Sequence, residues 1–156
     1  MIKIEKILFP TDFSEYSKYA FPYALSFAKE YGAKLYILHV IEDIQYLANA
    51  YMFDVPIMPS FADVEQNRLK EMQEFINREV KDKDIEIEKA IRRGRPFIEI
   101  IQMAHDENID LIVTATHGRG GLEHVVFGSV AERVVRKAPC PVLSIRMPGK
   151  EEASSD

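Results

Sequence analysis

The sequence predicts an α/β protein of one domain, with a five-stranded parallel doubly wound sheet and helices on both faces. Three observations predict this class. Short apolar segments alternate with longer segments of helical periodicity along almost the whole chain. The length of 156 residues suits one domain that buries a sizeable core. A composition of 47% hydrophobic and 29% charged residues is typical of globular proteins and argues against a disordered chain.

Five short segments are predicted to be strands, because aliphatic residues run or alternate through each of them. They are residues 3–9, 34–40, 85–92, 110–115 and 141–146. The fourth segment is continuously apolar, which favours a central place in the sheet. The third alternates apolar with mostly charged residues, which indicates a half-exposed strand. In this order of elements the last strand is expected at a sheet edge.

Four segments repeat apolar residues at helical spacing and are predicted to be helices, at 14–31, 63–80, 96–108 and 129–137. Ser14 or Asp12 is expected to cap the first helix, and Gly32 is expected to end it. Pro22 departs from the pattern, since an interior proline removes an N–H group and kinks a helix. Pro96 opens the third helix at the position in the first turn that proline favours.

Two segments show no such period. Residues 41–62 mix aromatic residues with two prolines, and we interpret them as an ordered insertion or a mobile loop. Residues 148–156 are polar and are predicted to be a disordered tail. The domain is therefore expected to span residues 1–147.

Composition also narrows the compartment and the partners. Cys140 is the only cysteine, so no internal disulfide can form and nothing indicates an oxidising compartment. No apolar run approaches the ~20 residues of a membrane helix, and the first ten residues lack the long apolar region of a signal peptide. The net charge is −5 without a dense Lys/Arg block. These features predict a cytoplasmic protein that binds neither membranes nor nucleic acid.

One segment, LIVTATHGRGGLEHVVFGSVAERVV at 111–135, holds four of the seven glycines, namely Gly118, Gly120, Gly121 and Gly128. Glycine in a loop indicates either a positive φ or a close approach of the backbone to another group. Ser129 followed by Glu132 has the spacing of a capping box, which predicts a helix start there. A glycine-rich link from a strand to a helix N-terminus suits a phosphate, because the first helical turn carries unpaired N–H groups and partial positive charge.

The phosphate-binding interpretation of this segment has several alternatives. The glycines can serve only tight turns, and Ser129 can serve only its own helix. A P-loop would need a lysine before the serine, and a dinucleotide fingerprint starting at Gly118 would need glycine in place of Glu123. A metal site on His117 and His124 is not expected, because six residues separate them and no cysteine is near.

The segments KILFPTDFSEYS and THGRGGLEHVVFGSVAERVVRKAPCPVL, taken together, resemble the universal stress protein family. The two motifs occur in the family's order, and the resemblance spans residues 7–146. It implies a Rossmann-like fold of the adenine nucleotide alpha hydrolase-like type. It also implies a dimer in most members, and ATP as the ligand of many.

The resemblance carries over to particular residues. The family's nucleotide pattern is Gly, two residues, Gly, nine residues, then Gly with Ser or Thr. Its second glycine is Gly118, its gap is 119–127, and its closing pair is Gly128 and Ser129. Its first glycine falls on Ala115, whose methyl group either crowds a ribose or is tolerated. The phosphate-facing part is intact, so nucleotide binding is expected to survive, at most weakened.

Further positions match the family near the first two strands. Asp12 resembles the acid that contacts ribose, although it can also be a helix-capping residue. Val40 and Thr114 match neighbours of the adenine, and Val40 can equally be plain core. Arg119 either neutralises phosphate charge or is solvated. The expected binding set is Pro10, Thr11, Asp12, Val40, Thr114, Ala115, Gly118, Arg119, Gly128, Ser129 and Val130.

The leading hypothesis is a cytoplasmic nucleotide-binding stress protein that acts as a sensor or regulatory module. ATP is its expected ligand, with Mg²⁺ or Mn²⁺ on the phosphates. No catalytic base is visible, so hydrolysis is expected to be slow at most. Adenylyl transfer is not favoured, because PTDFSEYS stands where such enzymes carry other signatures.

Two alternatives remain open. One is a dimeric scaffold that binds no nucleotide, which Ala115 would favour. The other is a pocket that prefers AMP or another adenosine compound. A homodimer is expected through the last strand, 141–146, since an apolar edge can pair with another subunit.

Overall fold

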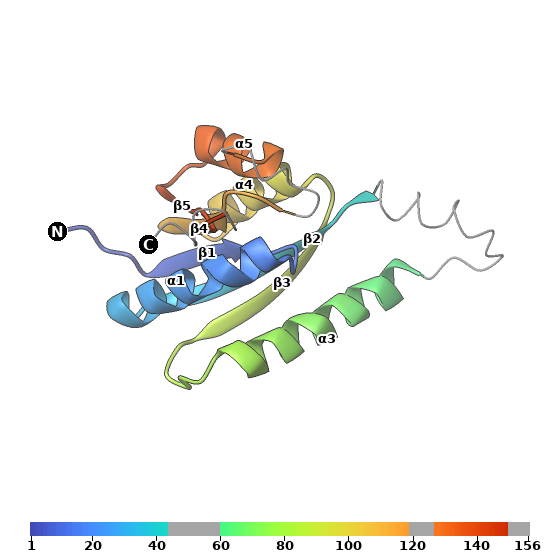
Figure 1. The fold of residues 1–156 in the computed structure, drawn as a ribbon, viewed down its shortest axis with the longest axis horizontal. Coiled ribbons are helices and arrows are strands. Elements are labelled where there is room, and N and C mark those ends of the chain that lie inside the picture. Colours follow the sequence, from blue (N-terminus) through green and yellow to red (C-terminus); the bar gives the residue numbers. More distant parts are fainter. Residues whose placement is uncertain (44–59, 119–126, 150–156) are drawn as a thin grey trace.

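The computed structural model describes residues 1–43, 60–118 and 127–149. Within these residues, five strands and four helices alternate along the chain (Figure 1). The strands are β1 (Lys6–Pro10), β2 (Lys34–Ile41), β3 (Ile87–Arg93), β4 (Leu111–Ala115) and β5 (Val142–Ile145). The helices are α1 (Glu15–Tyr31), α3 (Phe61–Glu79), α4 (Pro96–Asp106) and α5 (Ser129–Lys137). The predicted fold class is confirmed, and each predicted strand and helix is present.

The sheet is parallel throughout, with the strand order β3-β2-β1-β4-β5. The chain first winds outward from β1 through β2 to β3. It then crosses back to β4 on the other side of β1 and continues to β5. The direction of winding therefore reverses between β1 and β4. We call the carboxyl ends of these two strands the switch point, where ligands bind in open α/β sheets.

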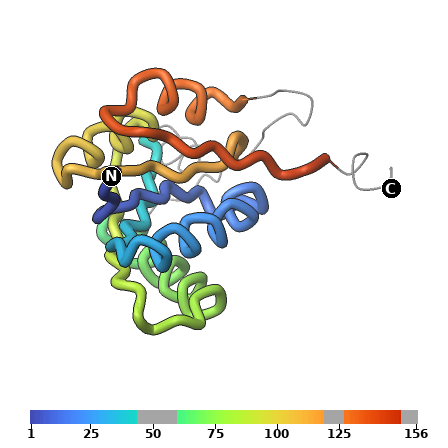
Figure 2. The backbone as a smooth tube through the Cα atoms, turned by 90° about the vertical axis from the view of Figure 1, so that its left-hand side faces the viewer, coloured from blue at the N-terminus to red at the C-terminus, as the bar shows by residue number. Residues whose placement is uncertain are grey.

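Two helices cover each face of the sheet (Figures 1 and 2). On one face, the α1 side chain of Phe21 lies between Phe9 of β1 and Phe75 of α3, with ring centroids 5.1 and 4.7 Å away. On the other face, aliphatic residues of the central strands pack against α4 and α5. The buried members there include Leu8, Leu38, Ile100, Met103, Ile112 and Val134. Two apolar cores thus hold the strands in place.

Both predicted limits of α1 are confirmed. The Ser14 hydroxyl accepts a hydrogen bond from the Ser17 N–H group, and Gly32 ends the helix in the left-handed conformation with φ of 62°. α1 continues through Pro22, which lies exposed on its outer face. The Pro22 carbonyl accepts a bond from the Ser26 hydroxyl at 2.8 Å.

The limits of other elements differ from prediction by a few residues. β1 begins at Lys6, three residues late, and α4 ends at Asp106, two residues early. The segment 41–62 is bounded by Ile41 in β2 and Phe61 in α3, and its residues 44–59 lie outside the described residues. Most of the predicted tail, at 150–156, also lies outside them. In the described part of the chain, no helix is long and apolar enough to cross a membrane.

Candidate functional site

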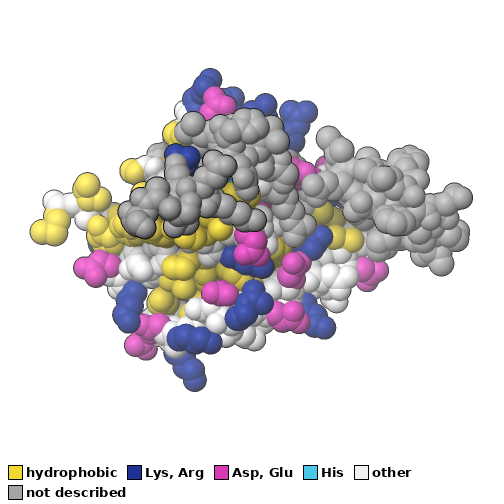
Figure 3. All heavy atoms as spheres, viewed as in Figure 1, with side chains coloured by type: hydrophobic (Ala, Val, Ile, Leu, Met, Phe, Trp, Pro, Cys, Tyr) yellow, Lys and Arg dark blue, Asp and Glu magenta, His cyan; other side chains and the backbone are white. Residues whose placement is uncertain are grey.

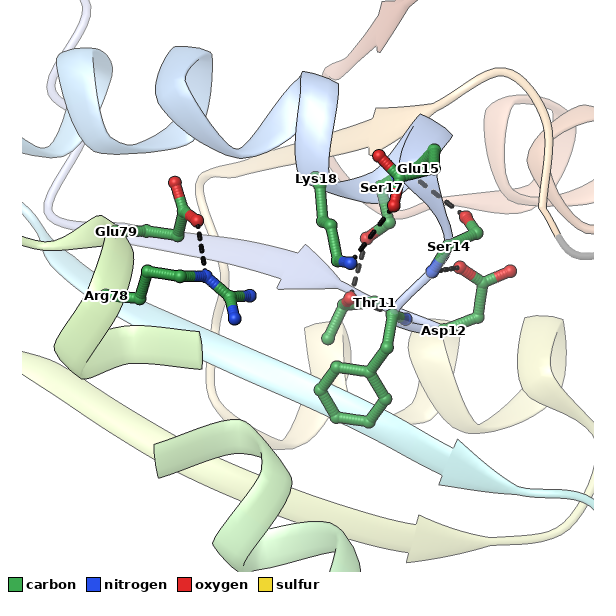
Figure 4. Close-up of polar contacts among 9 residues, drawn as sticks. Thr11, Asp12, Ser14, Glu15, Ser17, Lys18, Arg78 and Glu79 are labelled. Carbon is green, nitrogen blue, oxygen red and sulfur yellow. Dashed lines mark hydrogen bonds and ion pairs between the residues drawn. The ribbon is translucent and has the colours of Figure 1, made fainter. Parts of the chain in front are cut away.

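The turn after β1 is fixed by its own side chains (Figure 4). The Thr11 hydroxyl oxygen accepts bonds from the Phe13 N–H group at 3.1 Å and from the Ser17 hydroxyl at 2.6 Å. The Asp12 carboxylate accepts a bond from the Ser14 N–H group at 3.0 Å. Ser14 is therefore the cap of α1, and Asp12 braces the residue in front of the helix. This arrangement sets the direction of the Asp12 carboxylate at the switch point.

Phe13 adopts a left-handed backbone conformation, with φ of 61°. This conformation costs a non-glycine residue about 1–2 kcal/mol, so the surrounding packing must hold it. The Phe13 side chain is 7% exposed, and its ring lies 4.7 Å from the His39 ring, centroid to centroid. The sequence offered no signal for this turn, because phenylalanine rarely takes a positive φ. Sequence reasoning therefore missed Phe13 as a structural part of the site.

His39 joins the end of β2 to the same turn. Its Nδ1 atom lies 2.8 Å from the Thr11 carbonyl oxygen. A carbonyl can only accept, so Nδ1 carries the proton and donates. Burial lowers the pKa of His39 from its ordinary value, and the bond to Thr11 opposes that shift. His39 is thus a half-buried, hydrogen-bonded histidine.

His39 makes the stability of the fold depend on pH. Its folded pKa lies below the unfolded value of about 6.5, so the fold favours the neutral ring. The stabilisation is fully present above about pH 6.5 and is lost as pH falls through the folded pKa. We expect the urea midpoint of His39→Asn, whose amide can still donate to Thr11, to fall less between about pH 7 and about pH 5 than that of the wild type.

The matched control for this titration is His105→Asn, since His105 is exposed on α4. Its urea midpoint is expected to follow the wild-type pH dependence. Parallel curves for the wild type and His39→Asn would contradict the role of His39.

The start of α5 is held against the end of β4. The Thr116 N–H group donates to the Ile145 carbonyl at 3.0 Å, and the Gly128 N–H group donates to the Thr116 carbonyl at 2.6 Å. The described residues stop at Gly118 and resume at Phe127. Predicted residues between them, Arg119 among them, lie outside the described residues.

Gly118 brings the two strand ends together. A Cβ atom at Gly118 would lie 2.5 Å from the Asp12 Oδ2 atom, far inside van der Waals contact. One at Gly128 would lie 3.2 Å from the Thr116 carbonyl oxygen and 4.0 Å from the Gly118 nitrogen. These two glycines therefore permit a close approach of backbone to its neighbours. Asp12, Gly118 and Gly128, which are far apart in sequence, lie side by side.

The predicted capping box at Ser129 is wrong. Gly128 is the N-cap of α5, because its carbonyl accepts the first helical bond from the Glu132 N–H group at 3.0 Å. Ser129 is the first helical residue and is exposed, while the Glu132 carboxylate pairs with Arg136 at 2.5 Å. No described side chain caps this helix. The positive dipole end of α5 and its first N–H groups are therefore suited to attract an anion.

The remaining predicted residues lie on the two faces of the sheet. Ala115 is 8% exposed and belongs to the core beneath α1. Thr114, which is buried, points to the opposite face because strand side chains alternate. Val40 packs with the core on that opposite face, and Pro10 ends β1 between them in the sheet. The structure thus gathers Val40, Pro10 and Thr114 on the α4 side of the switch point.

His117 extends β4 into the switch point. It is buried, its Nδ1 atom lies 2.9 Å from the Thr116 hydroxyl oxygen, and its ring is 5.4 Å from that of Tyr16. Within the described ranges, no three His, Cys, Asp or Glu side chains converge as metal ligands. The site therefore consists of backbone N–H groups, one carboxylate and a partly apolar face.

Known proteins are similar to this chain in sequence and in fold. The model of the universal stress protein family matches residues 3–146. Universal stress protein MJ0531 of Methanocaldococcus jannaschii is 34% identical over 150 residues, which cover 94% of this chain and 85% of that protein. The solved structure of MJ0577 from the same organism has a TM-score of 0.79 at 28% identity, and the match covers 96% of this chain and 100% of that one.

A structure of a universal stress protein family protein from Arabidopsis thaliana is also similar, and it has AMP bound. Its TM-score is 0.58 at 23% identity, and the match covers 97% of both chains. At this identity the likeness concerns the fold alone.

Proposed function

This chain belongs to the universal stress protein family, and on that premise we propose that it binds an adenine nucleotide, with ATP first, at the switch point. One observation carries the proposal. The N-terminus of α5, which no described side chain caps, lies beside Gly118, and Gly118 lies against the carboxylate of Asp12. A helix end that attracts anions therefore lies next to a carboxylate that can accept hydrogen bonds from hydroxyl groups. A phosphorylated ribose has both a phosphate for the first and hydroxyl groups for the second. In this proposal the protein is a sensor or regulatory module.

Each part of the nucleotide has suitable partners. The N–H groups of Ser129 and Val130 would receive phosphate oxygens, and Arg119 would offset their charge. Asp12, with Thr11 behind it, would accept from the ribose hydroxyls. Pro10, Val40 and Thr114 present a partly apolar surface that suits an adenine ring. Mg²⁺ or Mn²⁺ would accompany the phosphates, whose oxygens are the ligands such ions prefer.

We propose slow hydrolysis at most. A general base must reach the attacking water. In this proposal the Asp12 carboxylate is engaged by the ribose hydroxyls, and His117 is buried beside Thr116 and Tyr16. These groups are better suited to holding the nucleotide than to hydrolysing it.

The first experiment is to purify the protein without added nucleotide, denature it, and identify released compounds by chromatography and mass spectrometry. ATP in near-stoichiometric amount is the expected result. AMP or another adenosine compound in its place would select the pocket that prefers such a ligand. If nothing is released and a calorimetric titration with Mg-ATP is flat, the nucleotide proposal fails and a scaffold that binds no nucleotide remains.

Ala115→Gly tests the departure from the family pattern. The Ala115 methyl group points into the core beneath α1, so its removal should cost about 1 kcal/mol of unfolding free energy. We expect the Kd for Mg-ATP to change less than about twofold, because the methyl group does not face the α4 side. Urea unfolding and calorimetry measure the two quantities. A clear gain in affinity would instead mean that the methyl group crowds the ligand.

We also propose a cytoplasmic homodimer that pairs through β5. β5 is an edge strand of the sheet, and Val142, Leu143 and Ser144 are only half-buried. An edge of this kind presents backbone groups that can pair with a second copy. Light scattering coupled to gel filtration should then give about twice the chain mass of 17.9 kDa. The cytoplasm is proposed because one cysteine, half-buried Cys140, allows no internal disulfide.

A further inference from the structure

A hollow of about 390 Å³ lies between the start of α4 and the outer face of α5, away from the residues of the switch point. Six residues line it, and we call them the basic groove: Arg95, Phe97, Glu132, Arg133, Arg136 and Lys137. Four of the six side chains are cationic. Figure 3 shows Lys and Arg side chains gathered over α5, at the top of the view.

Most of this positive charge is not neutralised locally. Glu132 forms an ion pair with Arg136. Within residues 1–43, 60–118 and 127–149, no carboxylate pairs with Arg95, Arg133 or Lys137. The chain as a whole carries a net charge of −5, so a local excess of cations stands out against it. Like charges that converge on one hollow repel one another until an anion enters.

Helix stability explains only part of this charge. Arg136 and Lys137 lie in the last turn of α5, where cations offset the helix dipole. Arg95 is the N-cap of α4, where the dipole disfavours a cation and where its side chain makes no capping bond. The first N–H groups of α4 add further positive potential beside it. The stability of α4 therefore gives no reason for an arginine at that position.

Two of the four cations are also held in position before any ligand binds. The Arg133 guanidinium lies 4.9 Å from the centroid of the Phe97 ring, and the Lys137 ammonium lies 5.8 Å from it. Contacts of this kind hold long side chains in place, so less conformational entropy is lost when a ligand binds. They also occupy the ring, which is then not available as a stacking platform for a nucleobase.

We propose that the basic groove docks a carboxylate-rich segment of a partner protein. Guanidinium groups bind carboxylates with two parallel hydrogen bonds, and three arginines meet here. A nucleic acid fits less well, because it needs many phosphate contacts along a longer path and the rest of the chain is acidic. A membrane surface fits less well, because two of the cations are drawn inward over Phe97. The groove shares no residue with the proposed nucleotide site.

The test uses the full chain and a fluorescein-labelled oligoglutamate peptide, with binding read from fluorescence anisotropy at low salt. We expect Arg133→Gln combined with Lys137→Gln to weaken binding by about tenfold or more. The matched control is Lys70→Gln combined with Lys83→Gln, which removes the same charge from exposed lysines elsewhere and should weaken binding less than about twofold. Arg95→Gln removes one cation without touching Phe97 and should weaken binding by about threefold.

Three results would overturn the proposal. The first is that the wild type does not bind the peptide, and the second is that the control pair of substitutions weakens binding as much as the groove pair. The third is that labelled single-stranded DNA or anionic vesicles bind through the groove more tightly than the peptide does. Thermal melts of each variant separate a lost contact from a lost fold. Peptide binding should persist in the presence of saturating Mg-ATP, so failure here and failure of nucleotide binding are separate outcomes.

Discussion

Gly118→Ala is expected to weaken binding of Mg-ATP by about tenfold to a hundredfold, measured by calorimetry. The added Cβ atom would lie 2.5 Å from the Asp12 Oδ2 atom. The Asp12 carboxylate must then move away from the position in which it would meet a ribose. The same movement disturbs its bond to the Ser14 N–H group. Binding should therefore fall more than stability does.

Two comparisons make this result specific. Gly149→Ala adds the same methyl group where nothing lies within 4 Å, and its affinity should equal that of the wild type. In a double-mutant cycle with Asp12→Ala, the Gly118→Ala effect should largely disappear, because the carboxylate it displaces is absent. Unchanged affinity in folded Gly118→Ala would remove Gly118 from the site. An equal loss in the Asp12→Ala background would mean that Gly118 acts independently of Asp12.

Phe21→Ala is expected to lower the unfolding free energy by about 3–5 kcal/mol. The Phe21 ring is fully buried and contacts Phe9 of β1 and Phe75 of α3. Its loss leaves a cavity where a strand and two helices meet, and the surroundings can collapse only in part. A single-domain protein often has little more stability than this. Urea unfolding followed by circular dichroism measures the change.

The control for this substitution lies on the same helix. Tyr23 is 43% exposed, so Tyr23→Ala should cost less than about 1 kcal/mol. Equal losses in the two variants would mean that burial of the Phe21 ring against Phe9 and Phe75 does not set the cost.

The fold was predictable because its signals are local. Periodicity in 14–31 and continuous apolar character in 110–115 each indicate one element, whatever the rest of the chain does. Strand order then follows from the few ways in which such elements wind. The observed ends of some strands and helices differ from the predicted ends by two or three residues, because the chain between those elements has no strong stop signal.

The candidate site was predictable only in part. Gly118 was expected to allow either a positive φ or a close approach of the backbone. The sequence could not tell that its neighbour is Asp12, because that contact depends on β1 and β4 being adjacent. The spacing of Ser129 and Glu132 gave the right helix and the wrong cap, since Gly128 can take the cap position as well. Phe13 was missed because its conformation is imposed by packing. The binding roles themselves stay predictions.

The hydrogen bond between Gly128 and Thr116 has a consequence for how this protein can be altered. The Gly128 N–H group donates to the Thr116 carbonyl at 2.6 Å, so the two flanks of the segment 119–126 lie next to each other. Extra residues placed there need not push α5 away from the sheet, and each doubling of loop length costs only about 0.6 kcal/mol. The segment is thus a natural insertion point for a guest domain. A fluorescent reporter spliced in between Gly118 and Phe127 would be anchored at the end of β4 and the start of α5, which would make it a sensor for whatever occupies the switch point.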